Sequence, residues 1–167
     1  MRDDRRDRGQ ALVEFALVVP IVMLLMCGIF DLGRVVFINN SLSDGARQGA
    51  RNASVDPRAT DYCTVVDDAV RSATRGQTLS TYRVEYQRID PAGLPVGAAL
   101  LLCQNGLDGP GKAAIPDAAQ PGDRVTIELG ADVDLILSFI ARATGQDSFN
   151  LHAESTMQVT FAPDAAP

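Results

Sequence analysis

The sequence predicts an α+β fold in which one long N-terminal helix packs on a small antiparallel sheet. Two observations predict it. An apolar run near the N-terminus keeps a helical pattern well beyond the length needed to cross a bilayer, and the later part of the chain carries several short stretches in which apolar and polar residues alternate. A chain of 167 residues leaves room for one small domain once the apolar segment is subtracted.

The apolar block at residues 11–30 begins the predicted helix. It holds about twenty residues, the length that a helix needs to cross a hydrocarbon core, and Glu14 is its only charge. Four arginines in "MRDDRRDR" precede it, and basic flanks stay in the cytoplasm. We therefore expect a cytoplasmic basic leader at residues 1–9, a single transmembrane helix of the cytoplasmic (inner) membrane at residues 10–38, and an extracytoplasmic domain at residues 39–162.

A cleaved secretory signal fits the apolar block poorly. The block is long for such a signal, and no small-residue cleavage pattern follows it closely. A lipoprotein signal needs a small residue before its cysteine, but Met26 precedes Cys27. An ordinary signal anchor remains the alternative.

The stretch "RGQALVEF" resembles the processing site of type IV-pilin-like precursors. In that pattern Gly9 ends the leader, Gln10 becomes the mature N-terminus, Glu14 is mature residue five, and the aromatic Phe15 follows. The continuation through "SLSDGARQGARNASV" resembles TadE-like proteins, the pseudopilins of tight-adherence (Flp) pilus systems, over roughly residues 8–55. That family typically has Tyr after the Glu, so Phe15 departs from it by one hydroxyl.

The resemblance implies a role for Glu14: its carboxylate pairs with the freed α-amino group of Gln10 in a neighbouring subunit. It implies a minor pilin or pseudopilin that assembles through its helix, contributes to adhesion and has a pilin-like fold. The implied partners are the membrane, other pilin subunits, the pilus assembly machinery and a prepilin-type peptidase. Two alternatives stay open: Glu14 lies at headgroup depth, or the chain is a signal-anchored extracytoplasmic binding module that never assembles.

A stripe of small residues follows the membrane segment on the same predicted helix. The stripe recurs every fourth residue, at Ser41, Gly45, Gly49 and Ala53. Two glycines within a helix cost roughly 2 kcal/mol against alanine, so close packing of another backbone should compensate. The partner is either the sheet of the same chain or a neighbouring helix, and we favour the sheet because a soluble helix must first cover its own core.

The C-terminal domain is expected to contain a second helix and several antiparallel strands. For the helix, Val65, Ala69, Val70 and Ala73 recur at helical spacing and Gly76 follows. The expected elements are a helix at residues 61–76, strands at 81–90, 96–104, 124–135 and 148–161, a loop at 105–123, a short helix at 135–145 and a flexible tail at 163–167. Residues Tyr82, Val84 and Tyr86 should share one strand face, as should Val125, Ile127 and Leu129.

Three cysteines divide between the membrane and the domain. Cys27 lies within the apolar block, whereas Cys63 and Cys103 form the natural disulfide pair if the domain is extracytoplasmic. Such a bridge would stabilise the fold by roughly 3–4 kcal/mol. The alternative is two unpaired buried thiols.

Neither the charge nor the motifs of the chain indicate catalysis. The formal charge of −6 argues against nucleic acid, which needs a basic face. "GLDGPGK" has the spacing of a phosphate-binding loop, but Ala113 stands where a hydroxyl should bind Mg²⁺. His152 is expected on a strand surface, and Asp132 with Asp134 supplies too few ligands for calcium. We expect no catalytic residue, metal, cofactor or small-molecule substrate, and so no enzyme.

Overall fold

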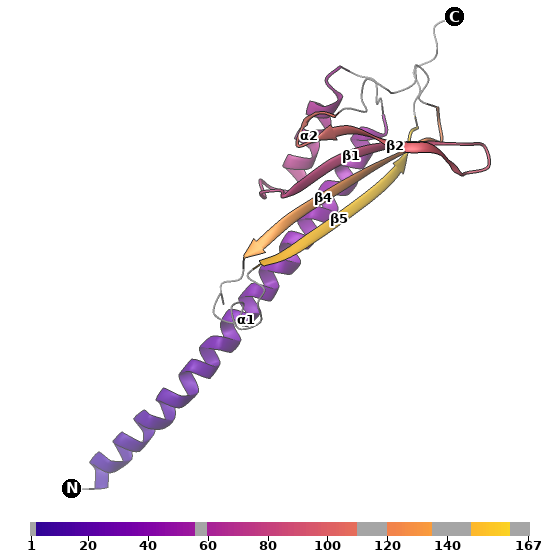
Figure 1. The fold of residues 1–167 in the computed structure, drawn as a ribbon. Coiled ribbons are helices and arrows are strands. Elements are labelled where there is room, and N and C mark those ends of the chain that lie inside the picture. The colour runs from indigo at the N-terminus through magenta and orange to yellow at the C-terminus, as the bar shows by residue number, and fades with distance from the viewer. Residues whose placement is uncertain (1–2, 56–59, 110–119, 135–147, 161–167) are drawn as a thin grey trace, which may run out of the picture. The chain divides into compact units, whose positions relative to one another are not determined.

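The structure, a computed structural model, has the α+β fold predicted from the sequence (Figure 1). It describes residues 3–55, 60–109, 120–134 and 148–160. The chain divides into two compact units, residues 1–36 with 134–148 and residues 37–133 with 149–167. The long helix α1, Asp3–Ala53, contributes its N-terminal part to the first unit and the rest to the second.

The apolar part of α1 exposes its large side chains on every side. The six consecutive residues 21–26 are each exposed by 43–63%, and six residues cover more than one full turn of a helix. The helix continues through Pro20. The segment Gly9–Ala53 of α1 is long and apolar enough to cross a membrane, as expected of a single-pass membrane protein.

Five strands form one sheet in the order β3-β2-β1-β4-β5. The central strand β1 pairs antiparallel with β2 on one side and with β4 on the other, so that Val84 faces both Cys103 and Ile127. In Figure 1 β4 and β5 run in opposite directions. The strands are β1 Thr81–Ile89, β2 Pro95–Gln104, β3 Leu107–Asp108, β4 Arg124–Asp134 and β5 Ser148–Gln158.

These strands confirm the four predicted ones, and the short β3 falls within the predicted loop at residues 105–123. Leu107 and Asp108 form it because the turn before them places them opposite Gln104 and Cys103. Asn105 and Gly106 both have positive φ in this turn, which is a common way to reverse a strand. The predicted helix at residues 135–145 and the predicted tail at residues 163–167 lie outside the described residues.

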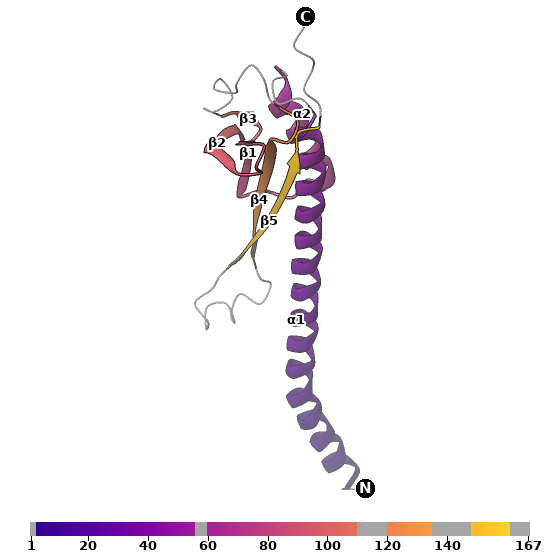
Figure 2. The ribbon, with the colours of Figure 1, turned by 90° about the vertical axis from the view of Figure 1, so that its right-hand side faces the viewer.

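The core of the second unit lies between one face of the sheet and two helices, which Figure 2 shows on the same side of the sheet. The second helix, α2, is Tyr62–Ala73. Alternation along the strands places the predicted residues on the inner face, where all six are at most 2% exposed: Tyr82, Val84, Tyr86, Val125, Ile127 and Leu129.

The buried face of α2 includes Val70 but not Val65, two of the residues that recur at helical spacing. Val65 is 47% exposed, whereas Val66 is fully buried together with Val70. The cause is Cys63, whose disulfide to β2 turns that side of the helix toward the sheet. Residues one turn and two turns further along the helix then follow it into the core.

Candidate functional site

The residues of the predicted processing site lie along the N-terminal part of α1. Gln10 and Glu14 are one turn apart, and the Nε2 of Gln10 donates a hydrogen bond to Oε1 of Glu14 at 3.3 Å. Both side chains are exposed, as is Phe15 at 67%. A Cβ built on Gly9 meets no atom within 4 Å. The helix therefore presents this whole motif openly.

The contact between Gln10 and Glu14 joins a neutral amide to a carboxylate. Among the residues that the structure describes, this amide is the only hydrogen-bond or ion-pair partner of the Glu14 carboxylate. At membrane depth an ionised carboxylate is costly unless a cation pairs with it. The arrangement can therefore accept a cationic group from another chain.

The stripe of small residues is buried in the second unit. Ser41, Gly45, Gly49 and Ala53 are buried. A Cβ at Gly45 would lie 2.5 Å from Cγ2 of Thr74 and 3.2 Å from Cδ1 of Leu129. Only a residue without a side chain allows α2 and β4 to approach α1 this closely.

Gly49 repeats this arrangement one turn later. A Cβ there would lie 2.6 Å from Cγ2 of Val70 and 2.8 Å from Cδ1 of Ile127. The partners at both glycines belong to the same chain, and the sheet that the sequence analysis favoured shares this face with a second helix, α2. This face of α1 is therefore occupied within the domain.

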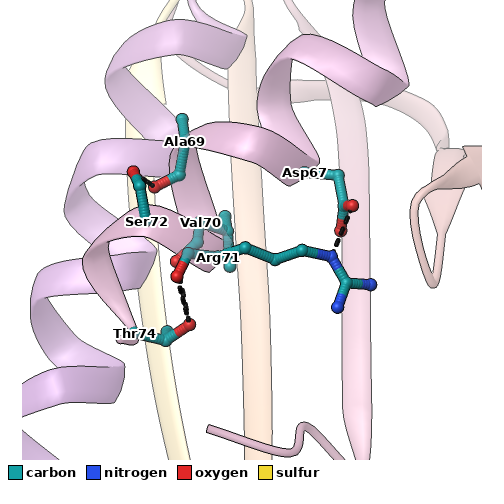
Figure 3. A network of polar contacts seen from close by, with 6 residues as sticks. All are labelled: Asp67, Ala69, Val70, Arg71, Ser72 and Thr74. Atoms are coloured by element: carbon teal, nitrogen blue, oxygen red, sulfur yellow. Dashed lines mark hydrogen bonds and ion pairs between the residues drawn. The ribbon is translucent and has the colours of Figure 1, made fainter. Parts of the chain in front are cut away.

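Thr74 follows the end of α2 and contacts Gly45 of α1; Figure 3 shows its hydrogen bond to Val70. Thr74 is fully buried with its methyl group toward Gly45, and its hydroxyl donates to the carbonyl of Val70 at 2.9 Å. The buried hydroxyl of Thr74 is therefore satisfied by a carbonyl in the last turn of α2.

On the outer side of α2, Nε of Arg71 donates a hydrogen bond to Oδ2 of Asp67 at 2.6 Å. This bond raises the pKa of Arg71.

The predicted disulfide is present and joins α2 to β2. Cys63 and Cys103 are bonded, with their Cα atoms 5.6 Å apart and 40 positions apart in sequence. Both are buried. Cys27 on α1 is a free cysteine and is partly exposed.

Sequence analysis missed the carboxylate of Asp123, which is 1% exposed at the start of β4. It accepts hydrogen bonds from the hydroxyl of Tyr86, from the amide N–H of Ile89 at 2.9 Å and from that of Gln120 at 2.9 Å. Burial raises the pKa of Tyr86, and the bond to Asp123 raises it further. A buried tyrosine hydroxyl usually has a hydrogen-bond partner. The predicted burial of Tyr86 could therefore have indicated that a polar side chain such as Asp123 lies beside it.

The outer face of the sheet carries the polar residues for which no chemistry was expected. His152 is exposed, with its Nδ1 4.0 Å from Oε1 of Glu128. Oδ1 of Asp132 accepts from Nδ2 of Asn150 at 2.6 Å. Among the residues that the structure describes, no group of three or more His, Cys, Asp or Glu is placed to hold a metal ion.

Comparison with known proteins agrees with the resemblance found in the sequence. Residues 9–51 match the family model described as TadE-like protein. No curated protein and no solved structure matches the chain. The matched stretch begins at Gly9 and covers Gln10, Glu14 and both stripe glycines, the residues whose geometry is given above. Over residues 9–51 the chain is therefore similar to the TadE-like proteins.

Proposed function

We propose that this protein is a minor pilin or pseudopilin of a tight-adherence (Flp) pilus or related secretion apparatus. Helix α1 holds it in the cytoplasmic membrane with its C-terminal domain outside, and the protein assembles through that helix and contributes to adhesion. The observation that carries the proposal is the place of Glu14. It is an exposed carboxylate one turn after Gln10, at the start of an exposed apolar helix, within the stretch that matches the TadE-like family.

Processing creates a counter-charge for Glu14. A prepilin-type peptidase cleaves after Gly9, and the new α-ammonium group of Gln10 in one subunit pairs with Glu14 of the next. Two unit charges 4 Å apart attract by about 4 kcal/mol at an effective dielectric constant of 20, which offsets part of the desolvation cost of both groups. The pair would set the stagger between neighbouring helices.

The burial pattern of α1 supports different roles for its two parts: contact with lipid and other subunits before residue 37, and packing of the domain after it. Most apolar side chains of α1 before residue 37 are exposed and can contact lipid first and neighbouring helices later. The face of Gly45 and Gly49 is filled by α2 and β4 of the same chain. Subunits therefore join through the N-terminal part of α1, and the rest of the helix carries the domain.

The test combines N-terminal sequencing of the mature chain with two matched substitutions. We expect a mature N-terminus at Gln10, and an uncleaved chain when Gly9 is replaced. Glu14→Gln keeps the size and hydrogen-bonding capacity of the side chain but removes its charge, so fibres and surface adhesion should be lost while the protein stays in the membrane. Glu154→Gln, which neutralises an exposed carboxylate on β5, should leave both unchanged.

Normal fibres from Glu14→Gln would contradict the proposal, as would an intact Met1 in cells with active peptidase. A signal-anchored module that never assembles makes the opposite prediction for a helix swap. If residues 10–38 are replaced by an unrelated anchor, such a module keeps its activity. A pseudopilin loses assembly.

A further inference from the structure

The side chain of Gln10 is held one turn along α1 by Glu14. Its Nε2 lies 3.3 Å from Oε1 of Glu14 and donates a hydrogen bond to it. Residues four apart are neighbours on the surface of a helix. A side chain that reaches toward the next turn carries its amide carbon away from the nitrogen of its own main chain. The contact with Glu14 therefore decides where the amide carbon of Gln10 lies.

The surroundings of Gln10 are open on the side where the processing site lies. A Cβ built on Gly9 meets no atom within 4 Å, and both Gly9 and Gln10 are exposed. Within the described part of the chain, Glu14 is the only residue that forms a hydrogen bond with the Gln10 side chain. A main-chain nitrogen set free before Gln10 would thus have room to move, and Glu14 alone would restrain the amide beside it.

A glutamine at a free N-terminus carries an amine and a carboxamide that can react with each other. The lone pair of the α-nitrogen attacks Cδ, so that the N–Cδ bond forms and the Cδ–Nε2 bond breaks. The side-chain nitrogen leaves as ammonia with the proton that the amine gives up, and a lactam ring, pyroglutamate, remains. The reaction needs no oxidant, reductant or second substrate, and like other covalent modifications it changes the charge of the chain.

The lactam removes the charge that Glu14 of a neighbouring subunit would bind. An α-ammonium group attracts a carboxylate, whereas the lactam N–H is neutral. A cyclised subunit would keep its helix and its domain but would have no positive charge at its terminus. Cyclisation of Gln10 would therefore withdraw a subunit from assembly.

We propose that Gln10 of the mature chain is a site of pyroglutamate formation and that Glu14 slows this reaction. Glu14 is a positioning residue here. Its hydrogen bond holds the amide carbon away from the α-nitrogen, and its negative charge favours the ammonium form, which has no lone pair for the attack. The inference rests on cleavage after Gly9 in the proposed function. It gives Glu14 a second task, which is to preserve the charged terminus of its own chain until a neighbour pairs with it.

The experiment produces the mature terminus without a prepilin-type peptidase. In the full chain, the residues directly before Gln10 are replaced by the recognition sequence of a site-specific protease, which exposes Gln10 in detergent at a known time. Mass spectrometry of the N-terminal peptide then follows the loss of one ammonia. We expect the Glu14→Ala chain to cyclise about threefold faster than the unaltered chain, because a hydrogen bond to a charged group is lost.

Glu14→Gln separates the hydrogen bond from the charge. Its side chain can still accept a hydrogen bond from Nε2 of Gln10 but is neutral, so its rate should fall between those of the unaltered and Glu14→Ala chains. Glu154→Gln, which neutralises an exposed carboxylate on β5, is the matched control and should cyclise as the unaltered chain does. Gln10→Met removes the amide and should lose no ammonia.

Equal rates in the unaltered and Glu14→Ala chains, with equal circular dichroism spectra, would overturn the role of Glu14. The site itself would be overturned if no chain lost ammonia over a period in which a free peptide of residues 10–15 cyclises completely. Failure of the proposed function looks different: an intact Met1 in cells with active peptidase would leave the rates measured after site-specific cleavage unchanged.

Discussion

Tyr82 and Tyr86 lie on the same face of β1 and are equally buried, yet only one of the two hydroxyls is satisfied. The hydroxyl of Tyr86 donates to the carboxylate of Asp123. The hydroxyl of Tyr82 is buried without a hydrogen-bond partner in the described part of the chain. The same substitution at the two positions should therefore have different effects.

Tyr86→Phe should lower the free energy of unfolding by about 1–3 kcal/mol, because a hydrogen bond to a buried carboxylate is lost. Tyr82→Phe should leave it unchanged or raise it, because no bond is lost and a buried polar atom is removed. Urea unfolding of the full chain in detergent, followed by circular dichroism, measures both. Equal losses from the two variants would contradict the assignment of the Asp123 bond.

The free energy of unfolding should fall at high pH, because Tyr82 and Tyr86 lose their protons more readily in the unfolded chain than in the folded protein. Burial raises the pKa of Tyr82, with Asp67 adding to it, and burial with Asp123 raises that of Tyr86. A tyrosine in the unfolded chain titrates near pH 10. Their contribution is therefore fully present below pH 10 and is lost as the pH rises toward their folded pKa values.

The measurement for this pH dependence is the urea midpoint between pH 8 and 11.5. We expect a decline above pH 10 that becomes shallower in Tyr86→Phe. Phenolate absorbance should appear at a higher pH in the folded protein than in the unfolded chain. A midpoint that stays constant through pH 11 would show that these hydroxyls are not held in their protonated form.

Gly49→Ala should destabilise the domain by about 1–3 kcal/mol. The added Cβ would lie within 2.8 Å of both Val70 and Ile127, so either the helix or the sheet must shift. Gly33→Ala on the same helix is the control, because its Cβ would meet no atom within 4 Å. A Gly49→Ala chain as stable as the Gly33→Ala chain would mean that α1 does not pack this closely.

Reduction of the disulfide should cost the domain about 3–4 kcal/mol, since it opens a loop of some 40 residues. The replacement of both Cys63 and Cys103 by alanine should show the same loss and make the stability insensitive to reductant. Cys27→Ser is the control, because this cysteine is free. Thermal unfolding with and without dithiothreitol distinguishes the three chains.

Much of the fold could be read from local pattern. Alternation of apolar and polar residues placed Tyr82, Val84 and Tyr86 on the buried face of β1, because a strand turns every second side chain the same way. The four-residue spacing of the small stripe placed Gly45 and Gly49 on one side of α1. These signals depend only on neighbouring residues.

The remaining features depend on contacts between distant parts of the chain. The rotation of α2 follows from the bond between Cys63 and Cys103, which local spacing of Val65 did not reveal. In the sheet β4 lies directly beside β1, although β2 and β3 come between them in the sequence. The role of Asp123 depends on Tyr86 on another strand.

The residues that pack against Gly45 and Gly49 are synthesised at two different times, because the chain is made from its N-terminus. Thr74 and Val70 follow soon after α1, whereas Leu129 and Ile127 are synthesised much later. Until β4 arrives, a strip of bare backbone on the helix is open on one side to any helix or chaperone nearby. Once β4 has packed against α1, this part of the helix can no longer bind another helix or a chaperone.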